Sequence, residues 1–377
     1  DAGGVTGGGR SCGPWDDETT AEVNKGALEA FFGAYPEYAK RPTFITGESY
    51  AGVYVPTLAE AVMNDPNTAV NLKGFAVGDP CIGTKDQDPA YGVAFQLDFL
   101  WGHGQLSKRT AAEVEHACAV DTSLRATAAR IAAGEMPANG ECTAALKQMK
   151  EEVGGYYTYA LYDECWGEND LSSSASPAPT SKSEPLPYLV VDEQRGAARV
   201  DARLRGGLND YQCGGPVVYR EWLNRTEVKT ALNLDPASVF FECDDGTDFD
   251  YTSSREQLFP FYRQVAKSSD VRVLVYNGDT DPCLNSFYAA NFTASLGFEE
   301  KQAWRPWTRD GRSKMGGYVV RYATQGGFDF VTIRGAGHMT PWYKPAATLA
   351  MLQAWIAGDD YPRYAPQAQA AAEAAAQ

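Results

Sequence analysis

The stretch PTFITGESYAG, residues 42 to 52, decides how the first part of this chain folds. Its apolar run, Phe44 to Thr46, predicts a buried strand. Small residues around Ser49 allow a sharp turn, and the sequence from residue 50 to residue 63 predicts a helix. Ser49 is therefore expected at the apex of a strand–turn–helix unit.

A serine at such a turn has a structural and a chemical interpretation. Serine commonly caps helices, so its position alone indicates little. The pattern around Ser49 is close to G-x-S-x-G, the nucleophile elbow of α/β-hydrolases, in which a strained turn exposes the hydroxyl. Ala51 stands where that motif has its second glycine, and Gly52 follows. The pentad is weak support by itself, so the rest of the sequence must decide.

The alternation of strand and helix recurs along the chain. The runs LKGFAVGD, VRVLVYNGDTD and FDFVTIRGAGH predict buried strands that end near Asp79, Asp281 and His338. Helices are expected at residues 20–32, 221–232, 256–266 and 345–356. This order predicts an α/β fold with a mostly parallel central sheet flanked by helices.

Composition divides the chain into a core and an insertion. Residues 1–108 are expected to form the first part of the core, and residues 206–360 the second part. Residues 109–205 predict a helical and irregular insertion that caps the sheet, with a linker-like stretch at 172–187. The Ala-rich tail, residues 361–377, is expected to be disordered.

The composition also limits the class of protein. Of the 377 residues, 44% are hydrophobic and 22% charged, which is typical of a globular chain. The net charge of -16 argues against a nucleic-acid or anionic-membrane partner. No apolar run approaches the length of a membrane span. The eight cysteines form no C-x-x-C pair and there are only three histidines, so we expect no metal site.

Cysteines and sequons indicate an oxidising compartment. Dispersed cysteines in a chain of this length predict disulfides, although sequence alone does not fix their pairing. Cys81 and Cys283 both follow predicted strands at the same sheet edge, and a disulfide between them is our own hypothesis. Asn224 and Asn291 begin Asn-x-Thr sequons and are candidate glycosylation sites.

Three predicted strands end in residues with catalytic chemistry. Functional residues gather at the carboxyl edge of open α/β sheets, and Ser49, Asp281 and His338 follow three such strands in the chain order of α/β-hydrolases. A serine needs a base, a histidine can take its proton, and a carboxylate can orient the imidazole. We therefore predict a Ser49–Asp281–His338 triad, with Asp279 as the alternative acid.

Ordinary roles for these residues also exist. An aspartate after a strand is often a helix cap or an Asx turn, and a lone histidine is more often structural. His103 lies in a glycine-containing turn, and His116 lies on a predicted helix. Only His338 follows a strand, within a glycine-rich loop, which makes it the candidate base.

Three blocks, GESYAGVYVPTLA, YNGDTD and RGAGHMTPWYKP, together resemble the active-site blocks of the serine carboxypeptidases. The likeness runs from about residue 20 to about residue 360 and includes EWLNRTEVKTAL. It implies an α/β-hydrolase fold and an enzyme that removes C-terminal residues from peptides through an acyl-enzyme at acidic pH, without a cofactor. It also implies a glycoprotein of the secretory pathway that is vacuolar, lysosomal or extracellular.

The resemblance implies roles for individual residues. It gives the histidine's partner as the second aspartate of the block, Asp281, and leaves Asp279 structural. Glu48 is implied to bind the substrate's C-terminal carboxylate, and a proton shared by two carboxyl groups favours acidic pH. The backbone N–H of Tyr50 is expected to be an oxyanion donor. Met339 is expected in the leaving-group pocket, with a packed core position as a nearly equal alternative.

The resemblance also implies two disulfides and a missing segment. Cys118 would pair with Cys142 within the insertion, and Cys165 with Cys213. Family members have a longer N-terminal portion that supplies strands and a second oxyanion donor. We therefore expect the sheet to lack those strands and residues 1–377 alone to have weak or no carboxypeptidase activity. The alternatives are an acyltransferase on the same scaffold and a truncated, inactive or binding homologue.

Overall fold

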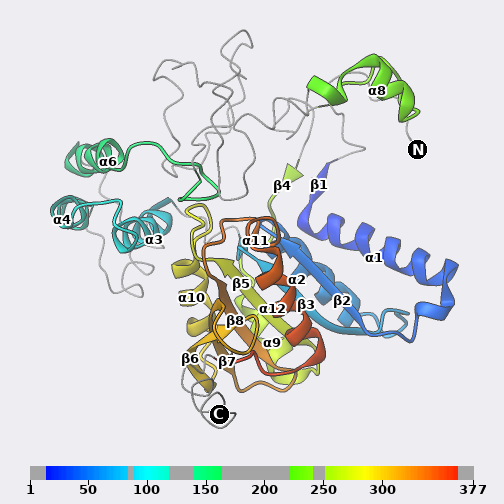
Figure 1. Cartoon of the computed structure of the whole chain (residues 1–377). Helices are drawn as coiled ribbons and strands as arrows, with labels where there is room; N and C mark the ends of the chain where they lie inside the picture. The colour runs from blue at the N-terminus through cyan, green and yellow to red at the C-terminus, as the bar shows by residue number, and fades with distance from the viewer. Residues whose placement is uncertain (1–13, 84–88, 119–139, 164–220, 241–250, 364–377) are drawn as a thin grey trace, which may run out of the picture. The chain divides into compact units, whose positions relative to one another are not determined.

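The computed structural model describes residues 14–83, 89–118, 140–163, 221–240 and 251–363 (Figure 1). The predicted linker at 172–187 and the predicted Cys165–Cys213 disulfide lie outside these residues. The chain forms two compact units. The larger unit comprises residues 17–154, 159–161 and 254–377, and the smaller comprises residues 1–16, 155–158 and 162–253.

A six-stranded sheet lies at the centre of the larger unit, in the order β2-β3-β5-β8-β7-β6. The first four of these strands are parallel, and β7 and β6 continue the sheet antiparallel. The strands are β2 (Thr43–Glu48), β3 (Leu72–Gly78), β5 (Arg272–Gly278), β6 (Glu300–Thr308), β7 (Met315–Tyr322) and β8 (Phe328–Ile333). This sheet confirms the predicted mostly parallel α/β fold, but the β6–β7 pair was not predicted.

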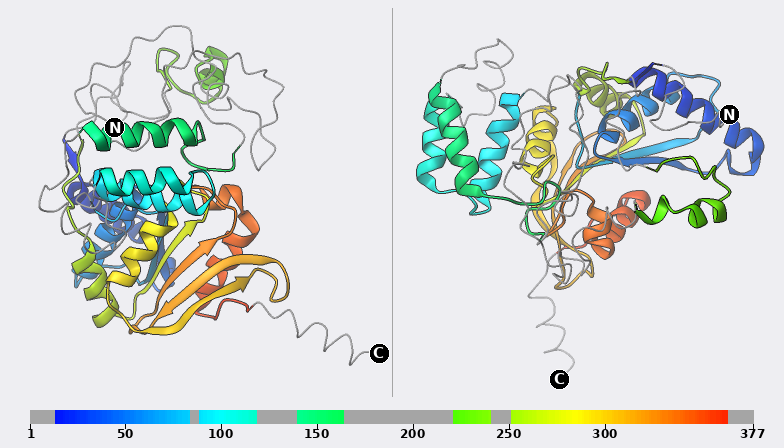
Figure 2. Two further views of the ribbon diagram at one scale, coloured as in Figure 1. Left: turned by 90° about the vertical axis from the view of Figure 1, so that its left-hand side faces the viewer. Right: turned by 90° about the horizontal axis from the view of Figure 1, so that it is seen from above.

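Helices cover both faces of the sheet. Helices α2 (Ala51–Met63), α9 (Phe259–Ser268) and α10 (Ser286–Ser295) share one buried apolar cluster with alternate residues of β3, β5 and β8. Helix α12 (Pro345–Ala357) lies on the opposite side, as the right-hand view of Figure 2 shows. Its Trp355 meets the ring of Phe44 edge-on, with the centroids 5.2 Å apart. A side chain at Gly74 would lie 2.8 Å from the same indole, so this glycine lets α12 approach the sheet.

The first helix extends the layer formed by α2. Helix α1 (Asp17–Ala34) is longer than the predicted segment and is followed by a 3₁₀ turn, η1 (Pro36–Tyr38). Phe32 of α1 packs with Leu58, Val62 and Val70 in a second buried cluster. Because burial of apolar surface is the main favourable term in folding, this contact fixes α1 against α2.

Part of the predicted insertion is a group of antiparallel helices. Helix α4 (Lys108–Ala117) packs on α6 (Gly140–Val153), and a disulfide joins Cys118 to Cys142, which confirms the predicted pairing. Helix α3 (Pro89–Gly102) was not predicted and packs between α4 and α10. Phe99 of α3 meets Phe287 of α10 edge-on, with centroids 6.0 Å apart.

Three predicted boundaries were wrong. Helix α9 begins three residues after its predicted start, because Pro260 belongs in the first turn, where its missing N–H costs nothing. The helix predicted at 221–232 is interrupted by a turn at residues 224–225, and α8 spans Thr226–Ala231. The tail that was predicted to be disordered starts too early at residue 361. Tyr361 is fully buried, and its hydroxyl donates to Asp329 at 3.1 Å.

The smaller unit contains α8 and a two-stranded parallel sheet of β1 (Trp15–Asp16) and β4 (Tyr251–Thr252). In the larger unit, the four-residue helix α11 (Thr340–Tyr343) precedes α12. Among the described residues, no helix combines the length and the apolar character needed to cross a bilayer.

The disulfide makes the α4–α6 pair sensitive to reduction. The bond closes a loop with a sequence separation of 24 residues. Loop-closure entropy then predicts that a Cys118→Ser, Cys142→Ser variant loses about 3 kcal/mol of stability in this helix pair. Hydrogen exchange of α4 and α6 measures the loss. The matched control is Cys283→Ser, because Cys283 carries a free thiol and its replacement removes no cross-link. Equal exchange in α4 and α6 of both variants would contradict the prediction.

Candidate active site

Ser49 occupies a strained turn between β2 and α2. Its φ angle is 63°, in the left-handed region that is uncommon for residues other than glycine. A Cβ at Gly47 would collide with the side chain of Ala51, and one at Gly52 would collide with the backbone at Cys81. Ala51 is therefore tolerated at the usual second-glycine position because Gly52 provides the close approach instead.

Hydrogen bonds to the neighbouring strand hold this turn. The Ser49 N–H donates to the carbonyl of Gly78 at 2.9 Å, and the Cys81 N–H donates to the carbonyl of Ser49 at 3.0 Å. Glu48 is paired in register with Gly78, so β2 and β3 end at the same level. The side chain of Ser49 remains partly exposed. A strained backbone held by its surroundings is typical of a nucleophile elbow.

Asp281 and His338 lie together at the same edge, in the loops that follow β5 and β8. The Nδ1 atom of His338 is 2.7 Å from Oδ2 of Asp281, and both side chains are buried. Asp281 also accepts hydrogen bonds from the backbone N–H groups of Cys283 at 2.9 Å and Leu284 at 3.2 Å. These bonds orient the carboxylate toward the imidazole and leave Nε2 as the nitrogen available for proton transfer.

Opposing effects act on the pKa of His338. Burial lowers this pKa, but the neighbouring Asp281 carboxylate and, more weakly, Glu48 raise it, and the net result is above the ordinary value. The pKa of Glu48 is raised to about 7, because burial and the charge of Asp281 outweigh the lowering effect of His338. Glu48 therefore lies within electrostatic range of both residues, next to Ser49.

Asp279, the alternative acid, has a different set of contacts. Its Oδ1 accepts a hydrogen bond from the Gly335 N–H at 2.5 Å, and its carbonyl lies 3.0 Å from Nε2 of His103. The Nδ1 of His103 is 2.7 Å from the carbonyl of Phe99. These bonds fix the loops around the edge, whereas Asp281 contacts His338. His116 is exposed near the end of α4.

Sequence reasoning missed Tyr159, which lies against His338. The two rings stack with their centroids 5.0 Å apart, and the Tyr159 carbonyl accepts a hydrogen bond from the His338 N–H at 2.7 Å. Two residues later, the Leu161 N–H donates to the carbonyl of Thr280 at 2.8 Å. This short segment links the loops that carry Asp281 and His338. No periodicity or motif around Tyr159 could have indicated it.

Asp17, at the start of α1, was also missed. It is fully buried, and its Oδ2 accepts hydrogen bonds from the N–H groups of Ser254 at 2.8 Å and Arg255 at 2.7 Å. Its Oδ1 accepts a hydrogen bond from the Tyr50 hydroxyl at 2.9 Å. Asp17 thus anchors the residue that follows Ser49. An acidic residue at a helix start was the available signal, but it reads as an ordinary cap.

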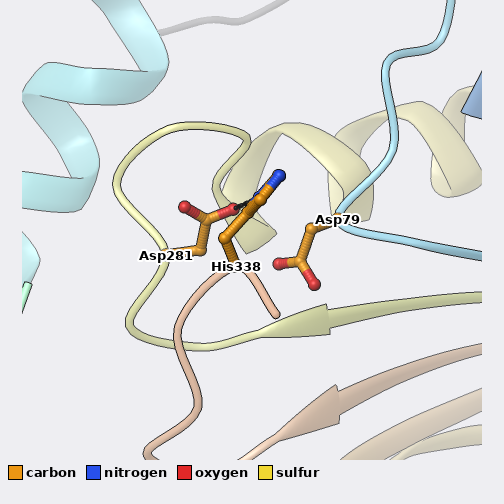
Figure 3. A group of neighbouring side chains, drawn as sticks. All are labelled: Asp79, Asp281 and His338. Atoms are coloured by element: carbon orange, nitrogen blue, oxygen red, sulfur yellow. Dashed lines mark hydrogen bonds and ion pairs between the residues drawn. The ribbon is translucent and has the colours of Figure 1, made fainter. Parts of the chain in front are cut away.

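Figure 3 shows a third carboxyl group beside the Asp281–His338 pair. Asp79, which follows β3, is completely buried, and ligand atoms of Asp79, Asp281 and His338 lie within 4.8 Å of one another. Two carboxylates and an imidazole are suitable ligands for a cation such as zinc. The Nδ1 of His338 is already bonded to Asp281, however, so a cation bound through Nδ1 would have to break that bond.

The remaining predicted site residues have mixed outcomes. The Cys81–Cys283 disulfide was wrong, because Cys283 carries a free thiol in the structure. Met339 is partly buried between His338 and α11, and its pocket role stays a prediction. Asn224 bonds to Phe240 through both amide atoms, and Asn291 lies on α10. Glycosylation at these two residues also stays a prediction.

The profile of the serine carboxypeptidase family matches residues 9–358. The chain belongs to the serine carboxypeptidase family. The recognition from three sequence blocks is thereby confirmed. One relative, the putative serine carboxypeptidase-like 30 of Arabidopsis thaliana, is 29% identical over 344 residues, which are 87% of this chain and 62% of the relative. The lysosomal protective protein of Mus musculus is 27% identical over an alignment that covers 92% of this chain and 71% of that protein.

A solved structure supports the fold. A prohormone-processing carboxypeptidase from Saccharomyces cerevisiae superposes with a TM-score of 0.57 at 16% identity, over 93% of this chain and 70% of that one. At this identity the likeness supports the α/β-hydrolase fold alone. This member of the serine carboxypeptidase family spans 62% to 67% of the length of three Arabidopsis relatives.

Replacement of Asp17 should loosen the elbow. Asp17→Ala removes the acceptor of two backbone N–H groups and of the Tyr50 hydroxyl. Buried donors left without partners cost about 1–3 kcal/mol each, so we expect a loss of at least ~2 kcal/mol in the free energy of unfolding. Urea denaturation measures this loss. The control is Glu22→Ala on the same helix, whose side chain is exposed. Equal midpoints for the two variants would contradict the proposed anchor.

Proposed function

We propose that this chain carries the catalytic centre of a serine carboxypeptidase that releases C-terminal residues from peptides through an acyl-enzyme. The observation that carries the proposal is the 2.7 Å contact between His338 and Asp281 at the sheet edge where Ser49 occupies its strained turn. A nucleophile, a base and an acid that orients the base are the parts that acyl transfer requires.

The residues have distinct roles in this mechanism. Ser49 Oγ attacks the carbonyl of the last peptide bond, and Nε2 of His338 takes its proton. Asp281 holds the imidazole through Nδ1 and stabilises the imidazolium that forms. The Tyr50 N–H donates to the oxyanion of the tetrahedral intermediate. His338 then protonates the departing amino group, and water releases the acyl-enzyme by the same steps in reverse order.

Glu48 gives the site its preference for a free C-terminus. With a pKa of about 7, its carboxyl group is largely protonated at acidic pH and can donate a hydrogen bond to the carboxylate of the substrate. Above pH 7 the two groups are both anions and repel each other. The same residue therefore supports both exopeptidase specificity and activity at acidic pH.

The proposed setting is the secretory pathway. The Cys118–Cys142 disulfide forms in an oxidising compartment, and one relative is named a lysosomal protective protein. We propose a vacuolar, lysosomal or extracellular glycoprotein that acts on the C-termini of peptides or proteins.

Active-site labelling tests the triad. A fluorophosphonate should modify Ser49, and Ser49→Ala should abolish the adduct found by peptide mass mapping. Asp281→Asn should slow labelling by about 10²–10⁴, because the imidazole loses the anion that fixes its tautomer. The matched control is Asp279→Asn, which removes a nearby carboxylate that bonds only to backbone in the described structure. Faster labelling of Asp281→Asn than of Asp279→Asn would reverse the assignment.

The pH dependence of substrate affinity tests Glu48. For a peptide with a free C-terminus, KM should rise as the pH passes about 7, because Glu48 loses its proton there. Glu48→Gln keeps a donor at every pH, so its KM should depend much less on pH. A peptide with an amidated C-terminus serves as the control and should lack the dependence in both enzymes. The role is excluded if Glu48→Gln retains the wild-type profile.

A further inference from the structure

Asp79 is a buried carboxyl group that the proposed mechanism does not use. It follows β3 with a φ angle of 42°, a left-handed conformation that costs energy in a residue other than glycine. Its side chain has no exposed surface. A residue that is both strained and fully buried beside a catalytic pair requires a physical explanation.

The hydrogen bonds of Asp79 are uneven between its two oxygens. Oδ1 accepts from the Gly278 N–H at 2.9 Å and from Nδ2 of Asn277 at 3.2 Å. Oδ2 is buried and has no hydrogen-bond partner among the described residues. An ionised carboxylate with one oxygen left unsatisfied in the interior is costly, whereas a protonated oxygen needs only an acceptor.

Among the described residues, the Asp281 carboxylate is a nearby acceptor for a proton on Asp79. Ligand oxygens of the two carboxyl groups and the ring nitrogen of His338 lie within 4.8 Å of one another, and Figure 3 shows the three side chains converging from separate loops. Asp281 receives two backbone N–H groups as well as the imidazole, so it is the better stabilised anion of the two. Two adjacent buried carboxyl groups cannot both ionise cheaply, which assigns the proton to Asp79.

We propose that Asp79 is a positioning residue whose neutral acid donates a hydrogen bond from Oδ2 to Asp281, fixing that carboxylate opposite His338. The inference rests on the proposed function only for its consequence in catalysis. The difference in hydrogen-bond donors around the two carboxyl groups is observed whether or not that function is correct.

The Gly278 N–H favours the ionised form of Asp79, but burial and the neighbouring acids favour the neutral form more strongly. Glu48 on β2 and Asp281 after β5 are acidic, and Tyr276 on β5 and Cys283 also lie within electrostatic range. In the part of the chain that the structure describes, the neighbouring base is His338, after β8, and it is bonded to Asp281. Burial first, and then the charges of Asp281 and Glu48, raise the pKa of Asp79 well above its ordinary value. Neutral Asp79 therefore contributes stability that is lost as the pH rises through this pKa.

Carbon-13 NMR of the aspartate carboxyl groups tests the protonation directly, without any substrate. At about pH 6, above the ordinary aspartate pKa, we expect a resonance at the shift of a protonated carboxyl group. Asp79→Asn should remove that resonance. Asp279→Asn, at the same sheet edge, is the matched control and should leave it in place. A spectrum without such a resonance, or one in which Asp79→Asn removes none of the resonances of protonated carboxyl groups, overturns the proposal.

The pH profile of Ser49 labelling tests the positioning role. In the wild type, ionised Asp79 at high pH repels Asp281, and labelling should fall. Asp79→Asn cannot ionise and its amide can still donate, so the ratio of labelling rates at pH 9 and pH 6 should rise by about threefold or more. A fluorophosphonate carries no C-terminal carboxylate, so Glu48 does not bind the probe. The comparison is also made in a Glu48→Gln background, so that Glu48 ionisation cannot account for the change.

The outcomes separate this inference from the proposed function. If the wild type is not labelled at Ser49, the proposed function fails, while the NMR measurement still decides the state of Asp79. If labelling occurs and the ratio is the same in Asp79→Asn, the function stands and the positioning role is wrong. Thermal unfolding at pH 5 establishes that Asp79→Asn is folded, and the loss of Tm between pH 5 and pH 9 should be smaller in this variant than in the wild type.

Discussion

The site depends on the level at which four parallel strands end. Pairing of Glu48 with Gly78, of Gly78 with Tyr276 and of Gly278 with Ile333 brings the carboxyl ends of β2, β3, β5 and β8 to one edge. A slip of one residue in any pair would turn each side chain of that strand to the other face of the sheet. The backbone register, set by the buried alternate residues, therefore determines which side chains meet.

The loops at this edge approach each other closely because glycines there have no side chain. A Cβ at Gly278 would collide with the carbonyls of Ala336 and Gly337, and one at Gly337 would collide with the carbonyl of Tyr159. Both the N–H and the hydroxyl of Thr280 donate to Ala336, at 2.9 Å and 2.7 Å. The loops of Asp281 and His338 are thus joined by backbone contacts. Their side chains meet because the loops cannot move apart, rather than because one ion pair attracts them.

The sequence predicted the parts of this site that local patterns encode. Apolar runs ending at Ser49, Asp281 and His338 indicated strands, and a common sheet edge then followed from parallel topology. The antiparallel strands β6 and β7 were missed because they lack regular alternation: β6 contains Pro306, and the register of the pair shifts at three places. Tyr159 and Asp17 were missed for a different reason, since each acts through contacts distant in sequence that no local pattern records.

The incorrect Cys81–Cys283 disulfide also shows what sequence patterns do not determine. Cys81 and Cys283 do lie close enough to interact electrostatically, as their positions after neighbouring strands predicted. Proximity of two sulfurs is not sufficient for a bond, because a disulfide also requires a narrow range of Cβ orientations. Hydrogen bonds hold the backbone of each cysteine in place: the Cys81 N–H donates to the carbonyl of Ser49, and the Cys283 N–H donates to the carboxylate of Asp281. Strand order fixes which residues are neighbours, and these bonds fix how they face.

The charges of the carboxyl groups around His338 decide whether it can act as the proposed base. Every carboxylate near His338 favours the imidazolium, which cannot accept the proton of Ser49. Asp281 has to be ionised to orient the ring, so the raised pKa of His338 is an unavoidable result of its partner. If Glu48 and Asp79 were also ionised, their charges would raise the pKa of His338 further, and the imidazole would hold a proton over a wider range of pH. Burial raises the pKa of both of these acids, so that one anion faces the imidazole instead of three. Neutral Glu48 and Asp79 therefore raise the pKa of His338 less than two further anions would, which favours the proposed role of His338 as the base.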